Sequence, residues 1–134
     1  MTDTLQESPM LDWPKLQPWA VVGVSENREK FGNKIYRDLK NAGYTVYGIN
    51  PRLTQIEGDP CYANLKSLPK VPAVVNLVIP PAATENVLRE CAELGIGRVW
   101  FQPGSESDDA LKLAEGLGLQ VLANACIMIQ KVTV

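Results

Sequence analysis

The sequence predicts a single α/β domain built on a parallel sheet of about five strands, with helices covering both faces. Three observations lead to this prediction. Short apolar runs alternate with amphipathic helical patterns along the chain. Each run ends beside a glycine, a proline or an asparagine, as expected for parallel strands that are buried on both faces. The length of 134 residues is close to the common size of one domain.

The strands are predicted from runs rich in Ala, Val, Ile, Leu and aromatic residues. The clear runs cover residues 19–25, 44–50, 73–79, 97–102 and 119–123. A short additional strand and a helical turn are expected between Tyr62 and Leu68, after a loop that contains Gly58 and Pro60. Strands that alternate with helices form right-handed βαβ units, so the predicted architecture is a Rossmann-like doubly wound sheet.

Three helices are predicted from apolar residues spaced one turn apart. The first ends at Ala42, the second opens at Pro80 and the third follows the N-cap residue Ser107. Proline fits the first turn of the second helix because the amides there have no intrahelical acceptor. A glycine, which readily adopts the left-handed conformation that ends many helices, closes each of them: Gly43, Gly95 and Gly118.

The composition is that of an ordinary globular protein, with 46% hydrophobic and 21% charged residues. Residues 1–17 lack the basic-then-apolar order of a signal peptide. They are interpreted as an N-terminal leader to one domain that spans residues 18–134. No apolar run approaches the roughly 20 residues that cross a bilayer. The expected localisation is therefore cytoplasmic, with no membrane partner.

Charge and residue counts exclude several function classes. A formal net charge of -2 gives no electrostatic reason to expect a nucleic-acid partner. The three cysteines lack CxxC spacing, which argues against a zinc site and against a disulfide framework. Histidine is absent, so Ser-His-Asp and Cys-His nucleophilic systems and histidine metal sites are excluded. No metal site is predicted.

Ligands of doubly wound sheets bind beyond the carboxyl ends of the strands, where the strand order reverses. In the loop after the first strand, Gly23 permits a tight turn, Ser25 offers a hydroxyl, and Gly32 lets a ligand approach the next helix, whose first turn favours phosphate. The candidate binding residues here are Gly23, Val24, Ser25, Lys30, Phe31, Gly32, Asn33 and Lys34. The spacing differs from G-x-G-x-x-G, so by itself it suits a purely structural turn equally well.

The end of the second strand separates two classes of nucleotide ligand. NAD-binding domains usually place Asp or Glu here to hold the ribose hydroxyls, whereas this chain has Asn50, Pro51 and Arg52. Arg52 would suit the ribose phosphate that NADP and coenzyme A share. A solvated arginine in a turn is the competing interpretation.

Other strand ends carry weaker signals. Pro80 removes an amide donor, which would either leave an apolar rim for an extended ligand or simply start a helix. Cys126 is interpreted either as a reactive thiol or as a small core residue. Four acidic residues are interpreted as solvent-exposed or as helix caps: Glu26, Glu29, Asp108 and Asp109. No two of them are marked as a paired acid and base, so no catalytic residue is predicted.

Taken together, these segments resemble the small stand-alone CoA-binding proteins, which look like the N-terminal domain of the succinyl-CoA synthetase alpha subunit. The similarity runs from about Trp19 to about Gln130. It is carried by the order and spacing of Val21–Ser25 with Gly32, Gly43–Tyr44 with Gly48–Pro51, Pro60–Leu65, Val74–Pro80, Val99–Gln102 with Gly104, and Asn124–Cys126.

The resemblance implies coenzyme A as the cofactor and a role for each strand end. The Ser25–Lys34 segment would hold the pyrophosphate region, and the Asn50–Arg52 segment would border the adenosine with its 3'-phosphate. The pantetheine path would be lined by Val78, Ile79 and Pro80. The thiol end would lie near Gln102 and Gly104.

The chain also departs from the family pattern. Asn76 stands where relatives often carry Asp, and residues 125–127 match the exit of the last strand only loosely. Met128 and Ile129 make this end more apolar than expected. The residues present include neither the phosphorylated histidine of the synthetase nor its ATP-binding parts, so the resemblance does not imply ligase activity.

Three hypotheses follow. The first is a binding module, not an enzyme, that holds coenzyme A or an acyl derivative without transforming it. The second is an NADP-binding protein or oxidoreductase. The missing G-x-G-x-x-G motif and the absence of an obvious proton donor argue against it. The third is a CoA-binding subunit completed by an ATP-dependent partner. The sequence does not determine the oligomeric state, and a homodimer is one possibility. An exposed Trp or Phe on an outer helix would indicate a dimer.

Overall fold

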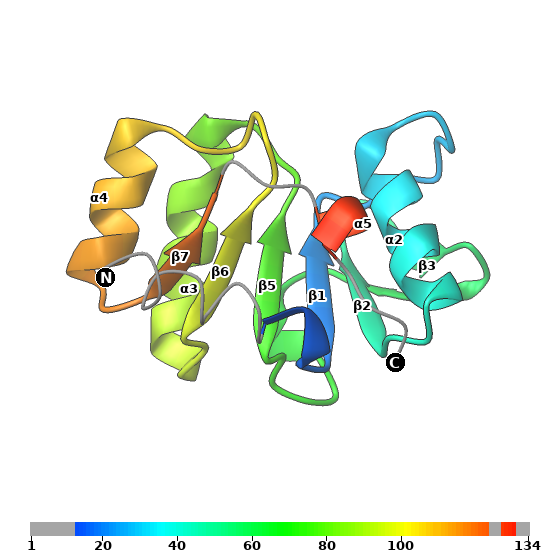
Figure 1. Cartoon of the computed structure of the whole chain (residues 1–134). Helices are drawn as coiled ribbons and strands as arrows, with labels where there is room; N and C mark the ends of the chain where they lie inside the picture. The colour runs from blue at the N-terminus through cyan, green and yellow to red at the C-terminus, as the bar shows by residue number, and fades with distance from the viewer. Residues whose placement is uncertain (1–12, 124–126, 131–134) are drawn as a thin grey trace.

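The structure is a computed structural model of the chain, and it describes residues 13–123 and 127–130. One twisted sheet forms the middle layer, with helices in front of it and behind it (Figure 1). Within the described ranges the sheet has seven strands: β1 Trp19–Val22, β2 Val46–Ile49, β3 Gln55–Ile56, β4 Asp59–Tyr62, β5 Val74–Leu77, β6 Arg98–Phe101 and β7 Gln120–Leu122.

The strands lie in the order β3-β4-β2-β1-β5-β6-β7. All neighbouring pairs are parallel except β3 with β4. The chain builds the sheet outwards from β1 through β2 to β4, and then returns to place β5 on the other side of β1. The strand order therefore reverses at β1, and the predicted Rossmann-like doubly wound sheet is confirmed.

All of the clearly predicted strands are present, and β3 and β4 bring the total to more than the expected five. These two form a hairpin whose turn residues, Glu57 and Gly58, have positive φ angles of 50° and 84°. Positive φ at both central residues is the geometry of a two-residue hairpin turn. Ile56 of the hairpin is fully buried, so the hairpin is tied to the core.

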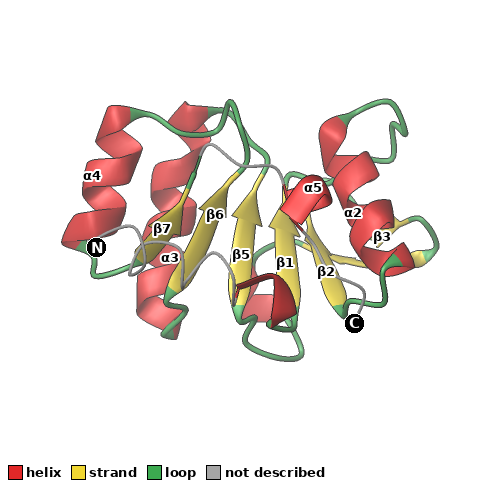
Figure 2. Cartoon of the chain, viewed as in Figure 1, coloured by secondary structure: helices red, strands yellow, loops and turns green. Residues whose placement is uncertain are grey.

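Helices cover both faces of the sheet (Figure 2). The described helices are the α-helices α2 Phe31–Asn41, α3 Thr84–Leu94, α4 Asp108–Gly116 and α5 Ile127–Gln130, with the short 3-10 helices η1 Trp13–Lys15, η2 Leu65–Ser67 and η3 Pro81–Ala83. Gly95 ends α3 in the left-handed conformation with φ of 76°. The Ser107 side chain caps α4 by accepting a hydrogen bond from the Ala110 amide at 3.1 Å. Both features agree with the helix signals in the sequence.

Side chains alternate between two apolar cores, one on each face of the sheet. In β1, Trp19 and Val21 pack with α2, α5 and η1, whereas Ala20 and Val22 pack with α3 and α4. This alternation follows from the pleat of a strand, and because both faces are covered the whole strand is apolar. Among the described residues, no helix has the length and apolar character needed to cross a membrane.

The end of the predicted leader belongs to the core. Trp13 is 2% exposed and its ring lies 6.2 Å from that of Trp100, centroid to centroid. The indole nitrogen of Trp19 donates to the Leu16 carbonyl at 2.8 Å, and the Tyr44 hydroxyl donates to the Pro14 carbonyl. The expected boundary between residues 17 and 18 therefore divides a segment that packs with the sheet.

We predict that Trp13→Ala lowers the free energy of unfolding by about 3 kcal/mol or more, because it empties a large site in a packed core. Denaturant unfolding measures this change. The matched control is Lys15→Ala in the same short helix, where the side chain is exposed and the expected change is within about 0.5 kcal/mol. Equal stability of the two variants would show that residues 13–17 are dispensable for the fold.

Candidate functional site

The carboxyl ends of β1, β2, β5 and β6 form one connected rim. The Gly23 amide donates to the Ile49 carbonyl at 3.0 Å, and the Val78 amide donates to the Val22 carbonyl at 2.9 Å. The Gln102 amide donates to the Leu77 carbonyl at 3.0 Å. Since these bonds extend the ladders of the sheet by one residue, the first residue after three of the strands is held in place by the sheet itself.

An open cleft of about 490 Å³ lies above this rim at the point where the strand order reverses. We call it the strand-end cleft. It is lined by Gly23, Val24, Ser25, Glu29, Lys30, Phe31, Gly32, Asn50, Val78 and Ile79. All of these except Glu29 are among the residues singled out from the sequence, so the fold brings most of the candidate binding residues together.

A smaller recess of about 120 Å³ adjoins the cleft. We call it the apolar recess, and it is lined by Phe31, Val78, Gln102 and Pro103. It shares Phe31 and Val78 with the strand-end cleft, so the two hollows are contiguous. Phe31 is 63% exposed although it is a large apolar residue, and it stands between the two hollows.

The start of α2 offers donors and positive charge to the strand-end cleft. Within the described residues, the amides of Phe31 and Gly32 donate to no protein acceptor, and Lys30 and Lys34 have no ion pair. The Ser25 hydroxyl oxygen accepts from the Asn27 amide at 3.0 Å, which leaves its own hydrogen free to donate. A helix N-terminus with unpaired amides attracts anions, and two lysines strengthen that attraction.

Two glycines allow close backbone contacts at the rim of the sheet, Gly23 against the end of β5 and Gly32 of α2 against the end of β1. Gly23 has φ of 107°, and a Cβ there would lie 2.3 Å from the Val78 carbonyl oxygen. A Cβ on Gly32 would lie 2.1 Å from the Gly23 carbonyl oxygen. Gly32 also lines the strand-end cleft, so its role in letting a ligand approach stays a prediction. Its missing side chain makes room for β1, and a larger residue would displace the helix as well as alter the cleft.

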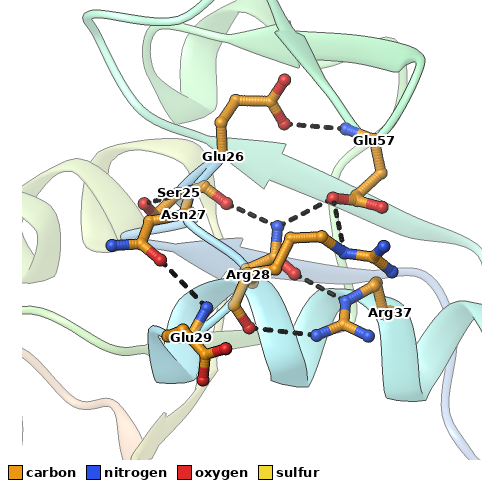
Figure 3. Close-up of polar contacts among 8 residues, drawn as sticks. Ser25, Glu26, Asn27, Arg28, Glu29, Arg37 and Glu57 are labelled. Carbon is orange, nitrogen blue, oxygen red and sulfur yellow. Dashed lines mark hydrogen bonds and ion pairs between the residues drawn. The ribbon is translucent and has the colours of Figure 1, made fainter.

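Asn33 holds the loop after β1 in position, and its side chain does not line the cleft. It is fully buried, and its side-chain nitrogen donates to the Ser25 carbonyl at 2.7 Å and to the Glu57 carboxylate at 3.0 Å. Its side-chain oxygen accepts from Arg37 Nε at 2.6 Å. Figure 3 shows this network, in which Arg37 also donates to the Arg28 carbonyl at 3.1 Å.

Asn50 joins the ends of β1 and β2 at the edge of the cleft. Its side-chain nitrogen donates to the Val24 carbonyl at 2.8 Å, and its side-chain oxygen accepts from the Arg52 amide at 2.8 Å. Gly104 is exposed, and its amide donates to the Glu106 carboxylate at 2.8 Å. The sequence-predicted residues that line neither hollow are Asn33, Lys34, Pro51, Arg52, Pro80 and Gly104.

Two lining residues were not predicted from the sequence. Glu29 was assigned to solvent, yet it lines the strand-end cleft beside Lys30. Pro103 directly follows Gln102 at a strand end, which is the one signal that could have placed it in the apolar recess. Glu29 carries no equivalent signal, because the shape of an irregular loop decides which of its residues face a ligand.

Among the described residues, buried polar groups also lie away from the cleft, including Tyr36 on α2 and Asn76 on β5. On the outer side of α2, the Tyr36 hydroxyl donates to the Asp59 carboxylate at 2.6 Å and Lys40 lies 3.3 Å from it. The hydrogen bond from Tyr36 and, to a smaller extent, Lys40 lower the pKa of Asp59. Asn76 of β5 is fully buried, and its side-chain atoms contact no hydrogen-bond partner among the described residues. A neutral amide is a less unfavourable occupant of such a site than an unpaired carboxylate would be.

The described thiols are not activated. Burial raises the pKa of Cys91 to about 12 and also raises the pKa of Cys61. Cys126, the candidate reactive thiol, lies outside the described residues. Within residues 13–123 and 127–130, no cluster of acidic residues and cysteines is arranged to hold a metal ion.

The charged and apolar groups of the lining lie at different ends of the site. The titratable lining residues are one carboxylate, Glu29, and one ammonium group, Lys30. Among the described residues the Ser25 hydroxyl oxygen accepts from the Asn27 amide, and no hydrogen bond joins it to Glu29. What the two hollows offer together is an anion-binding end at α2 and an apolar end at Phe31, Val78 and Pro103.

Comparison with known families identifies the domain to which the two hollows belong. A profile of the CoA-binding domain family matches residues 17–131. The chain belongs to this family. The match begins just before β1 and includes both hollows, so the whole candidate site lies within the family domain.

Relatives in the family are of two kinds. An ADP-forming acetate–CoA ligase of Archaeoglobus fulgidus is 28% identical over 87% of this chain but only 18% of its own length. The alpha subunit of such a ligase from Pyrococcus furiosus is 25% identical and is covered over 26% of its length. The chain therefore spans only a small part of the ligases it matches. By contrast, the uncharacterized protein YneT of Bacillus subtilis is 24% identical over 82% of both chains.

Two solved structures that this chain covers over most of their length share the fold. A conserved hypothetical protein of Pyrococcus furiosus is 37% identical, has a TM-score of 0.82, and is covered over 99% of its length by 86% of this chain. A hypothetical protein of Pyrococcus horikoshii is 29% identical with a TM-score of 0.85, and the match covers 97% of this chain and 89% of that one.

The contact between Gly32 and β1 can be tested by stability. We predict that Gly32→Ala lowers the free energy of unfolding by about 2 kcal/mol, since its Cβ overlaps a backbone oxygen that cannot move independently of the sheet. The matched control is Gly116→Ala in α4, where a Cβ meets no atom within 4 Å. Alanine should stabilise that helix by about 0.5 kcal/mol. A Gly32→Ala variant as stable as the control would contradict the packing derived for α2.

Proposed function

We propose that the protein binds coenzyme A, or an acyl derivative of it, in the strand-end cleft and the apolar recess, and does not transform it. The observation that carries this proposal is the pairing of the two hollows. One is lined by Lys30 and by the residues whose amides are unpaired at the start of α2, the other is mostly apolar, and Phe31 lines both. Coenzyme A has a diphosphate near one end and a less polar pantetheine arm leading to its thiol.

The residues present fit the phosphate end of such a ligand. The amides of Phe31 and Gly32, the Ser25 hydroxyl and the Lys30 ammonium group would hold the diphosphate. Lys34 lies one turn further along α2 and would add long-range attraction. Arg52 is exposed beside Asn50 at the edge of the cleft, where we place the adenosine and its 3'-phosphate together with Pro51.

The other end of the ligand would follow the ends of β5 and β6. Val78, Ile79 and Pro80 would line the pantetheine arm, and the thiol or acyl group would lie near Gln102. Gly104 would be a more distant neighbour, because its amide is already bonded to Glu106. No lining residue is paired with another as acid and base, which supports binding without chemistry.

A second candidate function is favoured by the relatives. The alpha subunit of the Pyrococcus furiosus ligase shows that the related segment also occurs in one chain of a multi-chain enzyme. A partner chain that supplies ATP-dependent chemistry would turn the same site into part of a ligase. The similarity to YneT over 82% of its length favours a module that works without ligase parts.

Calorimetric titration of the purified protein with coenzyme A, NADP and NAD tests the proposal. We expect micromolar affinity for coenzyme A, about -8 kcal/mol, and no binding of the nicotinamide cofactors. Binding of NADP without coenzyme A would overturn the ligand assignment. Co-purification of an ATP-dependent partner, with acyl-CoA formation only in its presence, would favour the ligase subunit over the independent module.

Phe31 gives a direct test of the two-part site. We predict that Phe31→Ala weakens coenzyme A binding by about tenfold, because it removes an aromatic wall common to the cleft and the recess. Val71→Ala is the matched control, since Val71 is also a large apolar residue that is exposed, at 62%, and it lies in neither hollow. Its affinity should equal that of the unchanged protein. Equal affinities of both variants would place the ligand elsewhere.

A further inference from the structure

The turn of the β3–β4 hairpin contacts the loop that lines the strand-end cleft, although the two are distant in sequence. The Glu57 amide donates to the Glu26 carboxylate at 3.0 Å. The Glu57 carboxylate accepts from the Asn33 side chain at 3.0 Å and lies 3.6 Å from Arg28 Nε. Figure 3 shows Glu57 reaching this loop from the neighbouring segment, through its main chain and its side chain.

These contacts hold the first half of the loop. Asn33 donates one hydrogen to Glu57 and the other to the Ser25 carbonyl at 2.7 Å, so Glu57 and Ser25 are joined through one buried side chain. Glu26 is bound directly. Within the loop, the Asn27 side chain accepts from the Glu29 amide at 3.0 Å. Ser25, Glu29 and Lys30 then line the cleft from a loop whose shape depends on the hairpin turn.

The backbone of Glu57 adds an independent observation. In the part of the chain that the structure describes, Glu57 is the one residue other than glycine with a positive φ, at 50°. A left-handed conformation is unfavourable for a residue with a Cβ and free of that penalty for glycine. The side chain of Glu57 is only 24% exposed, which reflects its contacts with the loop. The carboxylate therefore occupies a turn position that glycine would fit with less strain.

We propose that Glu57 is a positioning residue for ligand binding, which holds the Ser25–Lys30 loop in its binding shape before the ligand arrives. A loop that is ordered in advance loses less conformational entropy on binding, and affinity rises accordingly. The binding part of this inference rests on the proposed function. The ordering of the loop does not, because it concerns the protein without ligand.

The decisive variant is Glu57→Gly, which removes the carboxylate and relieves the strained backbone together. We expect an unfolding midpoint close to that of the unchanged protein, because the relief of the left-handed backbone offsets the lost hydrogen bond to the buried Asn33. Affinity for coenzyme A should fall by about tenfold, and amide hydrogen exchange across residues 25–30 should accelerate by about tenfold without ligand. A purely structural role would not separate binding from stability in this way.

Two further variants complete the test. Glu57→Gln keeps an oxygen that accepts from Asn33 and should restore affinity and exchange to within about threefold of the unchanged protein. Glu85→Gln is the matched control, because Glu85 pairs with Arg89 at 3.6 Å on α3, away from the cleft, and should change neither measurement.

Some results would overturn the inference. Glu57→Gly with unchanged affinity and unchanged exchange in residues 25–30 would show that the loop keeps its shape without the carboxylate. A parallel loss of stability and affinity in both Glu57 variants would reduce Glu57 to a fold-stabilising residue. If the unchanged protein binds no coenzyme A, the proposed function fails, while the exchange measurement on ligand-free protein still supports or overturns the role of Glu57.

Discussion

The first turn of α2 lies directly against the peptide group of Gly23, and the position of the candidate site depends on that contact. A Cβ on Gly32 would come within 2.1 Å of the Gly23 carbonyl oxygen, so the helix reaches the sheet only because residue 32 has none. The approach brings the unpaired amides of α2 to the rim of the sheet. The same approach forces the loop between β1 and α2 to turn away from the sheet and return within a few residues. That loop is therefore held in shape by contacts with another segment. An anion site at this point is thus a consequence of helix packing on β1.

The support comes from the β3–β4 hairpin, which lies between β2 and β5 in the chain, where a doubly wound sheet commonly has a helix. The hairpin extends the sheet edge and turns Glu57 towards the loop. Tyr36 and Lys40 of α2 bind Asp59 at the first position of β4, so the helix and the hairpin are also joined on their outer side. The site is therefore shaped by three segments: the end of β1, the start of α2 and a hairpin that covers no face of the sheet.

Features that depend on local patterns were predictable, and those that depend on distant partners were not. The clear strands and the helix stop at Gly95 follow from hydrophobic periodicity and from the ease with which glycine adopts positive φ. The hairpin was missed because Glu57 is an unusual residue for a left-handed turn position and the run around it is rich in loop-forming residues. Asn33 was expected near the ligand, yet its partners come from two other segments that sequence spacing does not reveal. Trp13 was placed in a leader because the sequence does not reveal its contact with Trp100. That contact makes Trp13 part of the core.

The chain has three tryptophans, and all of them lie in one cluster on the α2 face of the sheet. The ring of Trp100 is 6.2 Å from that of Trp13 and 5.7 Å from that of Trp19, and each of the three is at most 2% exposed. None of them lines the strand-end cleft or the apolar recess. Indoles at this spacing share excitation energy and give a strong near-ultraviolet dichroism when they are held rigidly. The intrinsic emission of the protein is consequently a sensitive optical report on the packing of this core.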